Sequence, residues 1–288
     1  MMKDIKQKSS IRKLIRTVMR NILSWILPHA LYSLLVIFIG KKLHKNSQNT
    51  LDDFQNNAIS TICPDLVVRH GPFKGMKYSG RESFSSALFP KLLGSYEREI
   101  QPIIEEICKQ EYTEVVDIGC AEGYYAIGFA MRMPKATIYA YDTDQAAACA
   151  CQKMARLNNV DQRVITGSFC SNETLQKIPF RGKGLIISDC EGYEISLFSE
   201  RIVPTLARHD LLIELHDFID INISSIIRKQ FERTHEIIAI ESIDDIKKAQ
   251  TYSFEELQNC SLQERKQLLS EWRPSIMQWF YMKSFQKQ

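Results

Sequence analysis

Small and acidic residues follow two apolar segments of this chain, in a pattern typical of nucleoside-binding sites. The first run, Asp117 to Gly123, reads Asp-Ile-Gly-Cys-Ala-Glu-Gly and begins at the end of the apolar segment Val115–Ile118. A turn of small residues lets backbone amides approach a ligand closely, and an acid beside it can accept hydrogen bonds. Asp142 follows the next apolar segment, Thr137–Tyr141, where a carboxylate can bind both hydroxyls of a ribose.

The turn is not the glycine pattern of pyrophosphate-binding dehydrogenases, because Ala121 occupies the middle glycine place. Two acids at adjacent strand ends suit a nucleoside that carries an amino acid, and Asp117 could contact its ammonium group directly or through water. The alternative role for Asp142 is a helix cap, for which Asp144 is the more natural candidate. We expect the cofactor site to comprise Asp117, Gly119, Cys120, Ala121, Glu122, Gly123, Tyr125, Asp142 and Ser168.

A second set of titratable residues ends two later apolar segments and could act on an acceptor molecule. It comprises Asp189, Glu191, Glu214 and His216. His216 is the best candidate for a general base because imidazole titrates near neutral pH, and Asp189 or Glu191 could orient it or the substrate. We therefore expect these four residues to be catalytic.

Other roles remain open for the same residues. Glu191 and Glu194 could stabilise the start of a helix over residues 195–208, and His216 could be a buried histidine without a chemical role. Asp189, Glu191 and Glu214 could instead bind a divalent ion, since magnesium prefers oxygen ligands. We expect no metal in the site.

Short apolar strands alternate with helical patterns after residue 113, which predicts a doubly wound α/β fold. We expect a mostly parallel seven-stranded, Rossmann-like sheet with helices on both faces, and ligands outside the carboxyl ends of the strands. The predicted strands are 115–118, 137–141, 163–166, 185–189, 211–216, 235–240 and 277–283, and helices are predicted at 96–109, 124–133, 145–157 and 195–208.

Three regions are expected along the chain. Residues 1–45 form a basic and apolar helical segment, and residues 46–112 a linker, a hairpin-like entry at 67–78 and a helical cover. Residues 113–288 form the catalytic core. Lys91, Tyr96 and Glu97 could fold over the cofactor as part of the cover.

The N-terminal region holds most of the excess positive charge. Ten of the 37 basic residues but one of the 34 acidic residues lie in residues 1–45, which leaves the remainder with a net charge of −6. Residues 22–40 carry no formal charge, apart from titratable His29, and Pro28 interrupts them. We expect association with an anionic membrane surface at the cytoplasmic face; a true span or a helix packed on the body are alternatives. The acidic core disfavours nucleic acid as a partner.

The cofactor turn resembles that of the class I S-adenosylmethionine-dependent methyltransferases. The sequence from Asp189 to Glu194, followed by Glu214 to His216, is similar to the FkbM-like branch, as are Gly71 to Met76 and Pro90 to Glu97. The resemblance covers roughly residues 67–283. In the turn, Cys120-Ala121-Glu122 stands where the commoner pattern is Gly-Ala-Asn.

This resemblance implies transfer of a methyl group from S-adenosyl-L-methionine, with S-adenosyl-L-homocysteine as the product. The expected acceptor is a hydroxyl group of a sugar, a lipid-linked glycan or a small metabolite. The alternatives are a catalytically silent, membrane-tethered module that binds the cofactor, and a protein methyltransferase.

Overall fold

The computed structural model describes residues 52–286. The chain divides into two compact units, residues 1–53 and 54–288. The predictions for residues 1–45, including the apolar stretch at 22–40, lie outside the described residues. Within the described part of the chain, no helix is both long enough and apolar enough to cross a membrane.

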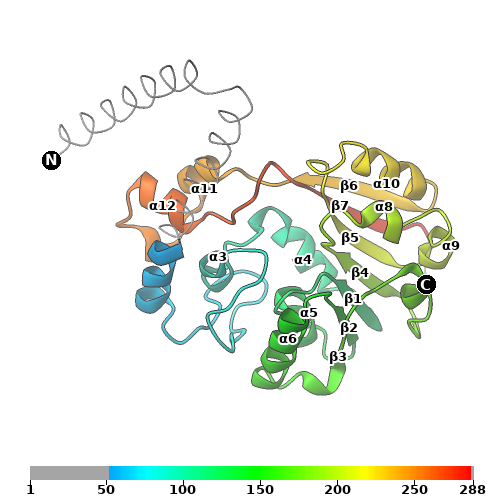
Figure 1. Ribbon diagram of the computed structural model, residues 1–288, viewed down its shortest axis with the longest axis horizontal. Helices are drawn as coiled ribbons and strands as arrows, with labels where there is room; N and C mark the ends of the chain where they lie inside the picture. The colour runs from blue at the N-terminus through cyan, green and yellow to red at the C-terminus, as the bar shows by residue number, and fades with distance from the viewer. Residues whose placement is uncertain (1–51, 287–288) are drawn as a thin grey trace, which may run out of the picture. The chain divides into compact units, whose positions relative to one another are not determined.

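A seven-stranded sheet forms the centre of the second unit (Figure 1). Its order is β3-β2-β1-β4-β5-β7-β6, and β7 alone runs antiparallel to its neighbours. The strands are β1 (Glu114–Ile118), β2 (Thr137–Tyr141), β3 (Val164–Gly167), β4 (Gly184–Ser188), β5 (Asp210–Leu215), β6 (His235–Glu241) and β7 (Gln278–Ser284). The predicted doubly wound, mostly parallel seven-stranded sheet is confirmed.

Helices cover both faces of the sheet. Successive side chains of a strand point to opposite faces, and here both sets are apolar, so each face must be buried. Val115 packs in one apolar cluster with the helices α4 (Gln101–Ile107), α5 (Tyr124–Arg132) and α6 (Gln145–Leu157). Val116 packs in the other, with α7 (Asn172–Gln176), α8 (Glu194–Leu197), α9 (Val203–Leu206) and α10 (Ile223–Phe231). The central strands β1, β4 and β5 are therefore buried along their whole length.

The prediction of a single helix over residues 195–208 is wrong. The structure has two short helices there, α8 and α9, separated by residues 198–202. Pro204 lies in the first turn of α9, where its missing N–H costs nothing and its fixed φ suits a helix start. The same proline cannot donate the backbone hydrogen bond that an uninterrupted helix requires at this position.

Two segments outside the sheet pack against each other. The first, called the cover, is residues 67–97; it begins with an antiparallel bridge between Val67 and Lys77 and holds α3 (Leu88–Leu93). The second, called the insertion, is residues 242–277 between β6 and β7, with α11 (Asp245–Thr251) and α12 (Leu262–Leu268). Figure 1 shows α11 and α12 away from the sheet. The backbone N–H of Glu97 donates to Glu271 across this contact, at 3.1 Å.

Candidate functional site

A cavity of about 310 Å³ opens where the parallel strands end. Ile118 at the end of β1 is paired with Tyr141 of β2 and with Ser188 of β4. The residues that follow these three strands therefore meet at one edge of the sheet. Nine of the predicted site residues line the cavity: Asp117, Gly119, Cys120, Ala121, Tyr125, Asp142, Ser168, Asp189 and Glu191.

The turn after β1 is held in a conformation that favours glycine. Gly119 has φ +83°, and a Cβ atom there would lie 1.7 Å from the carbonyl oxygen of Asp189. The N–H groups of Gly119 and Cys120 both donate to the Tyr141 carbonyl, at 2.9 and 3.0 Å. Ala121 also has a positive φ, +48°. The backbone of β1, β2 and β4 is thus drawn together at this turn, with space for a ligand beside it.

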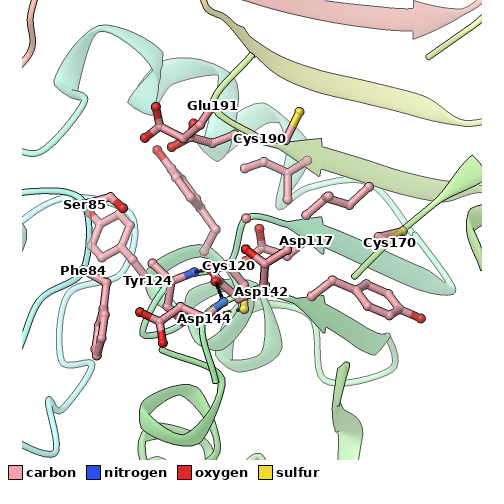
Figure 2. Close-up of a pocket in the computed structure, with 18 of the residues that line it drawn as sticks. Phe84, Ser85, Asp117, Cys120, Tyr124, Asp142, Asp144, Cys170, Cys190 and Glu191 are labelled. Carbon is pink, nitrogen blue, oxygen red and sulfur yellow. Dashed lines mark hydrogen bonds between the residues drawn. The ribbon is translucent and has the colours of Figure 1, made fainter. Parts of the chain in front are cut away.

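Asp117 presents a buried carboxylate to the cavity (Figure 2). Its Oδ2 atom is buried and has no hydrogen-bond partner. Burial raises the pKa of Asp117 to about 7, an effect that nearby Asp142 reinforces and the N–H of Ala126 opposes. A buried acceptor without a partner is costly in a folded protein unless a ligand supplies the donor. The position fits a cationic or hydrogen-bond-donating ligand group.

Asp142 follows β2 on the neighbouring side of the cavity. Its Oδ2 accepts the N–H of Ala121 and its Oδ1 the N–H of Asp144, both at 2.8 Å. These two bonds fix the carboxylate, and each oxygen keeps a further lone pair for a ligand hydroxyl. Asp144 caps α6 by accepting the N–H of Ala146, so Asp142 is not that cap.

Glu122 binds the cover and is not among the residues that line the cavity. Its carboxylate is paired with Lys91 Nζ at 2.5 Å, and both side chains are buried. It also accepts the N–H of Phe84 at 3.1 Å. Glu122 and Gly123 are not among the cavity-lining residues, whereas Lys91 and Tyr96 of the cover are. The sequence pattern placed Glu122 in the turn correctly but gave no sign of its ion pair with Lys91.

Asp189 and Glu191 follow β4 and line the cavity. Figure 2 shows Glu191 across from Asp142. His216, at the end of β5, lies behind them and is not among the lining residues. Its Nε2 atom is 3.4 Å from Asp189 Oδ1 and 3.4 Å from Glu191 Oε2. Its Nδ1 atom is 2.7 Å from Glu194 Oε1. The acid–base set predicted from the sequence is therefore brought together, with Glu194 added to it.

The electrostatics of His216 differ from those of a free general base. Burial lowers its pKa, but contacts with Glu191 and Glu194 and the charge of Asp189 outweigh burial and raise the pKa to about 10. A histidine with this pKa is already protonated at neutral pH and cannot accept a proton there. Without another cation in the cluster, His216 holds its neighbouring carboxylates in place.

Glu214 belongs to a buried ion network behind the cavity. Its Oε1 atom contacts Arg273 Nη1, and Arg273 also binds Glu97 at 2.6 Å and Glu271 at 3.0 Å. Glu97 in turn accepts the hydroxyl of Tyr125, which lines the cavity. Arg273 therefore connects the insertion, the cover and β5. No motif surrounds it in the sequence, so sequence reasoning missed it.

Comparison with known proteins is consistent with this geometry. The family model described as the methyltransferase small domain matches residues 101–180, which include the turn and Asp142. The chain has the class I methyltransferase fold. The match supports an S-adenosylmethionine-dependent methyltransferase. No curated protein matches this chain, and no match assigns it to the FkbM-like branch.

Several solved methyltransferase structures are distantly similar to this chain. A human methyltransferase 10 domain containing protein is 13% identical, with 81% of this chain and 98% of that chain covered and a TM-score of 0.47. A precorrin-6y C5,15-methyltransferase from Geobacter metallireducens is 11% identical (64% and 89% covered, TM-score 0.44). An O-methyltransferase from Bacillus cereus in complex with SAH is 13% identical (62% and 78% covered, TM-score 0.41). At these distances the likenesses carry no inference about substrate.

Proposed function

We propose that this methyltransferase is an O-methyltransferase that uses S-adenosyl-L-methionine to methylate a hydroxyl group of a sugar, a lipid-linked glycan or a small metabolite. The observation that carries the proposal is the arrangement of carboxylates around one cavity. Asp117 and Asp142 line the cavity on the side of the nucleotide turn, Glu191 lies across from them (Figure 2), and Asp189 also lines the cavity. One side suits a cationic nucleoside, and the other suits a hydroxyl that must lose a proton.

The residues present fit the cofactor. The unpartnered Oδ2 of Asp117 is a suitable acceptor for the ammonium group of the methionine part, and Asp142 has free lone pairs for the two ribose hydroxyls. Gly119 lets the turn pack against the backbone of Asp189, because a Cβ atom there would lie 1.7 Å from that carbonyl oxygen. The cavity of about 310 Å³ lies at the lower end of the range for small-molecule sites, about 300–1,000 Å³.

The bound cofactor would supply an electrophilic methyl group on a sulfonium. The chain's own task is to hold the acceptor oxygen in line with that group and to take up the hydroxyl proton. Asp189 and Glu191 are the carboxylates that reach the cavity from the end of β4, so they are placed to bind the hydroxyl and to accept its proton. His216 acts as a positioning residue, because it contacts both carboxylates from behind.

Methyl transfer can be tested directly with the purified full-length chain. Radiolabelled S-adenosyl-L-methionine is incubated with separated glycan, lipid, small-metabolite and protein fractions, and label is measured in each. We expect label in a hydroxyl-bearing glycan, lipid or metabolite, and loss of transfer in Asp189→Asn. The control is Glu173→Gln, an exposed residue of α7.

Two outcomes would contradict the proposal. Label that enters proteins alone would make the chain a protein methyltransferase. If S-adenosyl-L-homocysteine binds but no fraction is labelled, the chain is a silent cofactor-binding module instead.

A further inference from the structure

Three side chains at the ends of β4 and β5 could share one cation. Asp189, Glu214 and His216 each offer one ligand atom, and these atoms all lie within 4.8 Å of one another. Glu191 adds a fourth group, since its Oε2 is 3.4 Å from His216 Nε2. From the sequence we expected no metal, with the three carboxylates Asp189, Glu191 and Glu214 as alternative ligands; the structure adds the imidazole to them.

Hydrogen bonding does not account for the spacing at His216 Nε2. The distances from Nε2 to Asp189 Oδ1 and to Glu191 Oε2 are both 3.4 Å, beyond the range of about 2.7–3.2 Å for N–H···O bonds. Asp189 Oδ1 is buried and has no hydrogen-bond partner. Ligand atoms that bind one ion at about 2.1 Å, at octahedral or tetrahedral angles, are about 3.0–3.4 Å apart. The observed spacing is that of neighbouring ligands around an ion.

The other ring nitrogen of His216 supplies an independent observation. His216 is 2% exposed, and its Nδ1 is 2.7 Å from Oε1 of Glu194, which is fully buried. The same oxygen accepts the N–H of Gly192 at 3.1 Å, so Glu194 is held in place. Metal-binding histidines commonly donate one N–H to a carboxylate, which orients the ring and leaves the second nitrogen for the metal. Here that second nitrogen points toward Asp189 and Glu191.

The charge around the cluster also calls for a cation. Three carboxylates contact the His216 ring, those of Asp189, Glu191 and Glu194. A fourth, that of Glu214, has an oxygen within 4.8 Å of the ligand atoms of Asp189 and His216. The cations nearby are His216 itself, when its ring is protonated, and Arg273, which pairs with Glu214 but shares its guanidinium with two further glutamates of the ion network. Glu194 and Glu214 are buried, whereas the side chains of Asp189 and Glu191 are 30% and 61% exposed. A divalent ion that displaces the Nε2 proton would pair with the carboxylates in place of that proton.

We propose that Asp189, His216 and Glu214 bind one divalent metal ion, with Glu191 at the side that opens to the cavity. One imidazole and several carboxylates are a ligand set that suits a first-row divalent ion such as Mn²⁺. Because Asp189 and Glu191 line the cavity, an ion held there would lie at its wall, where it could hold the acceptor oxygen and lower the pKa of its hydroxyl; Glu191, on the open side, would accept the proton. That last role rests on the proposed methyl transfer, whereas metal binding itself does not.

The test measures Mn²⁺ binding to the purified, metal-depleted full-length chain. Electron paramagnetic resonance of free Mn²⁺ at neutral pH gives the stoichiometry and the dissociation constant in the absence of any cofactor. We expect one tight site per chain. Glu194→Gln should weaken binding about 10–100-fold, as loss of a ligand-orienting carboxylate does, and Asp189→Asn should weaken it further.

Controls separate a built site from adventitious binding. Glu111→Gln removes a carboxylate whose side chain is 86% exposed, so it should leave Mn²⁺ binding unchanged. Circular dichroism checks that each variant is folded, and His216→Ala provides a second ligand variant if Asp189→Asn is not. The proposal is overturned if the wild type binds no Mn²⁺ at millimolar concentration, or if Asp189→Asn and His216→Ala bind it as tightly as the wild type. Binding of S-adenosyl-L-homocysteine is measured separately. If the cofactor product binds and Mn²⁺ does not, the metal site fails and the proposed methyltransferase function does not.

Discussion

Substitution of Gly119 by alanine tests whether the close approach of β1 and β4 builds the cavity. The new Cβ would lie 1.7 Å from the Asp189 carbonyl oxygen, so one of the two backbones must move by more than an ångström. That movement displaces the turn that faces the cofactor and the strand end that carries Asp189. From sequence alone, a bulky residue at this position is expected to block the ligand and leave the fold intact. The structure predicts a loss of stability as well.

A matched glycine separates the two causes of that loss. Gly75 has φ +90°, close to the φ of Gly119, but a Cβ atom there would meet nothing within 4 Å. Gly75→Ala should therefore cost only the strain of a positive φ, about 1–2 kcal/mol. Gly119→Ala adds the steric overlap, typically about 1–3 kcal/mol, for a total of about 2–5 kcal/mol. With about 2–4 °C of melting temperature per kcal/mol for a domain of this size, the expected decreases are about 2–8 °C and about 4–20 °C.

Thermal unfolding followed by circular dichroism measures both variants, and titration calorimetry with S-adenosyl-L-homocysteine measures binding at a temperature where both are folded. We expect Gly119→Ala to melt below Gly75→Ala and to lose affinity, and Gly75→Ala to bind as the wild type does. Equal melting temperatures for the two variants, or unchanged binding by Gly119→Ala, would refute the reasoning about this turn.

Three further predictions concern charged groups. Because the pKa of Asp117 is about 7, cofactor affinity should rise as the pH increases from 6 to 8 and the carboxylate forms, and calorimetry should find no such rise from this group in Asp117→Asn. Lys91→Ala should destabilise the fold by about 3–5 kcal/mol, because it leaves Glu122 buried and unpaired. In urea unfolding, the double variant Lys91→Met, Glu122→Leu should recover most of that stability. No recovery would argue against the broken ion pair as the cause. His216→Ala should lower kcat and leave the dissociation constant of S-adenosyl-L-homocysteine unchanged, because His216 lies behind the cavity wall; an unaffected kcat would remove it from the acceptor site.

The sequence was sufficient for the sheet and for the residues at the ends of its strands. Apolar runs such as Val115–Ile118 mark buried parallel strands, and the carboxyl ends of such strands meet at one edge. That rule alone brings Asp117, Asp142 and Asp189 to one cavity, as the structure shows.

Partners from distant segments could not be predicted in this way. Glu122 lies in the expected turn, but its ion pair is with Lys91, 31 residues earlier in the chain. Glu194 looked like a residue that stabilises a helix start, yet it contacts His216. Arg273 lies in the insertion, where no periodic pattern indicates that its side chain reaches β5. Such contacts depend on how the cover and the insertion pack, which no local spacing specifies.

Binding of S-adenosyl-L-homocysteine to the full-length chain can be measured by titration calorimetry. We expect one binding site per chain, with affinity strongly reduced in Asp142→Ala, because that carboxylate is the expected partner of both ribose hydroxyls. Reduced nicotinamide adenine dinucleotide, whose fluorescence reports binding, should not bind. Absence of S-adenosyl-L-homocysteine binding by the folded wild type, or equal binding by wild type and Asp142→Ala, would contradict the account.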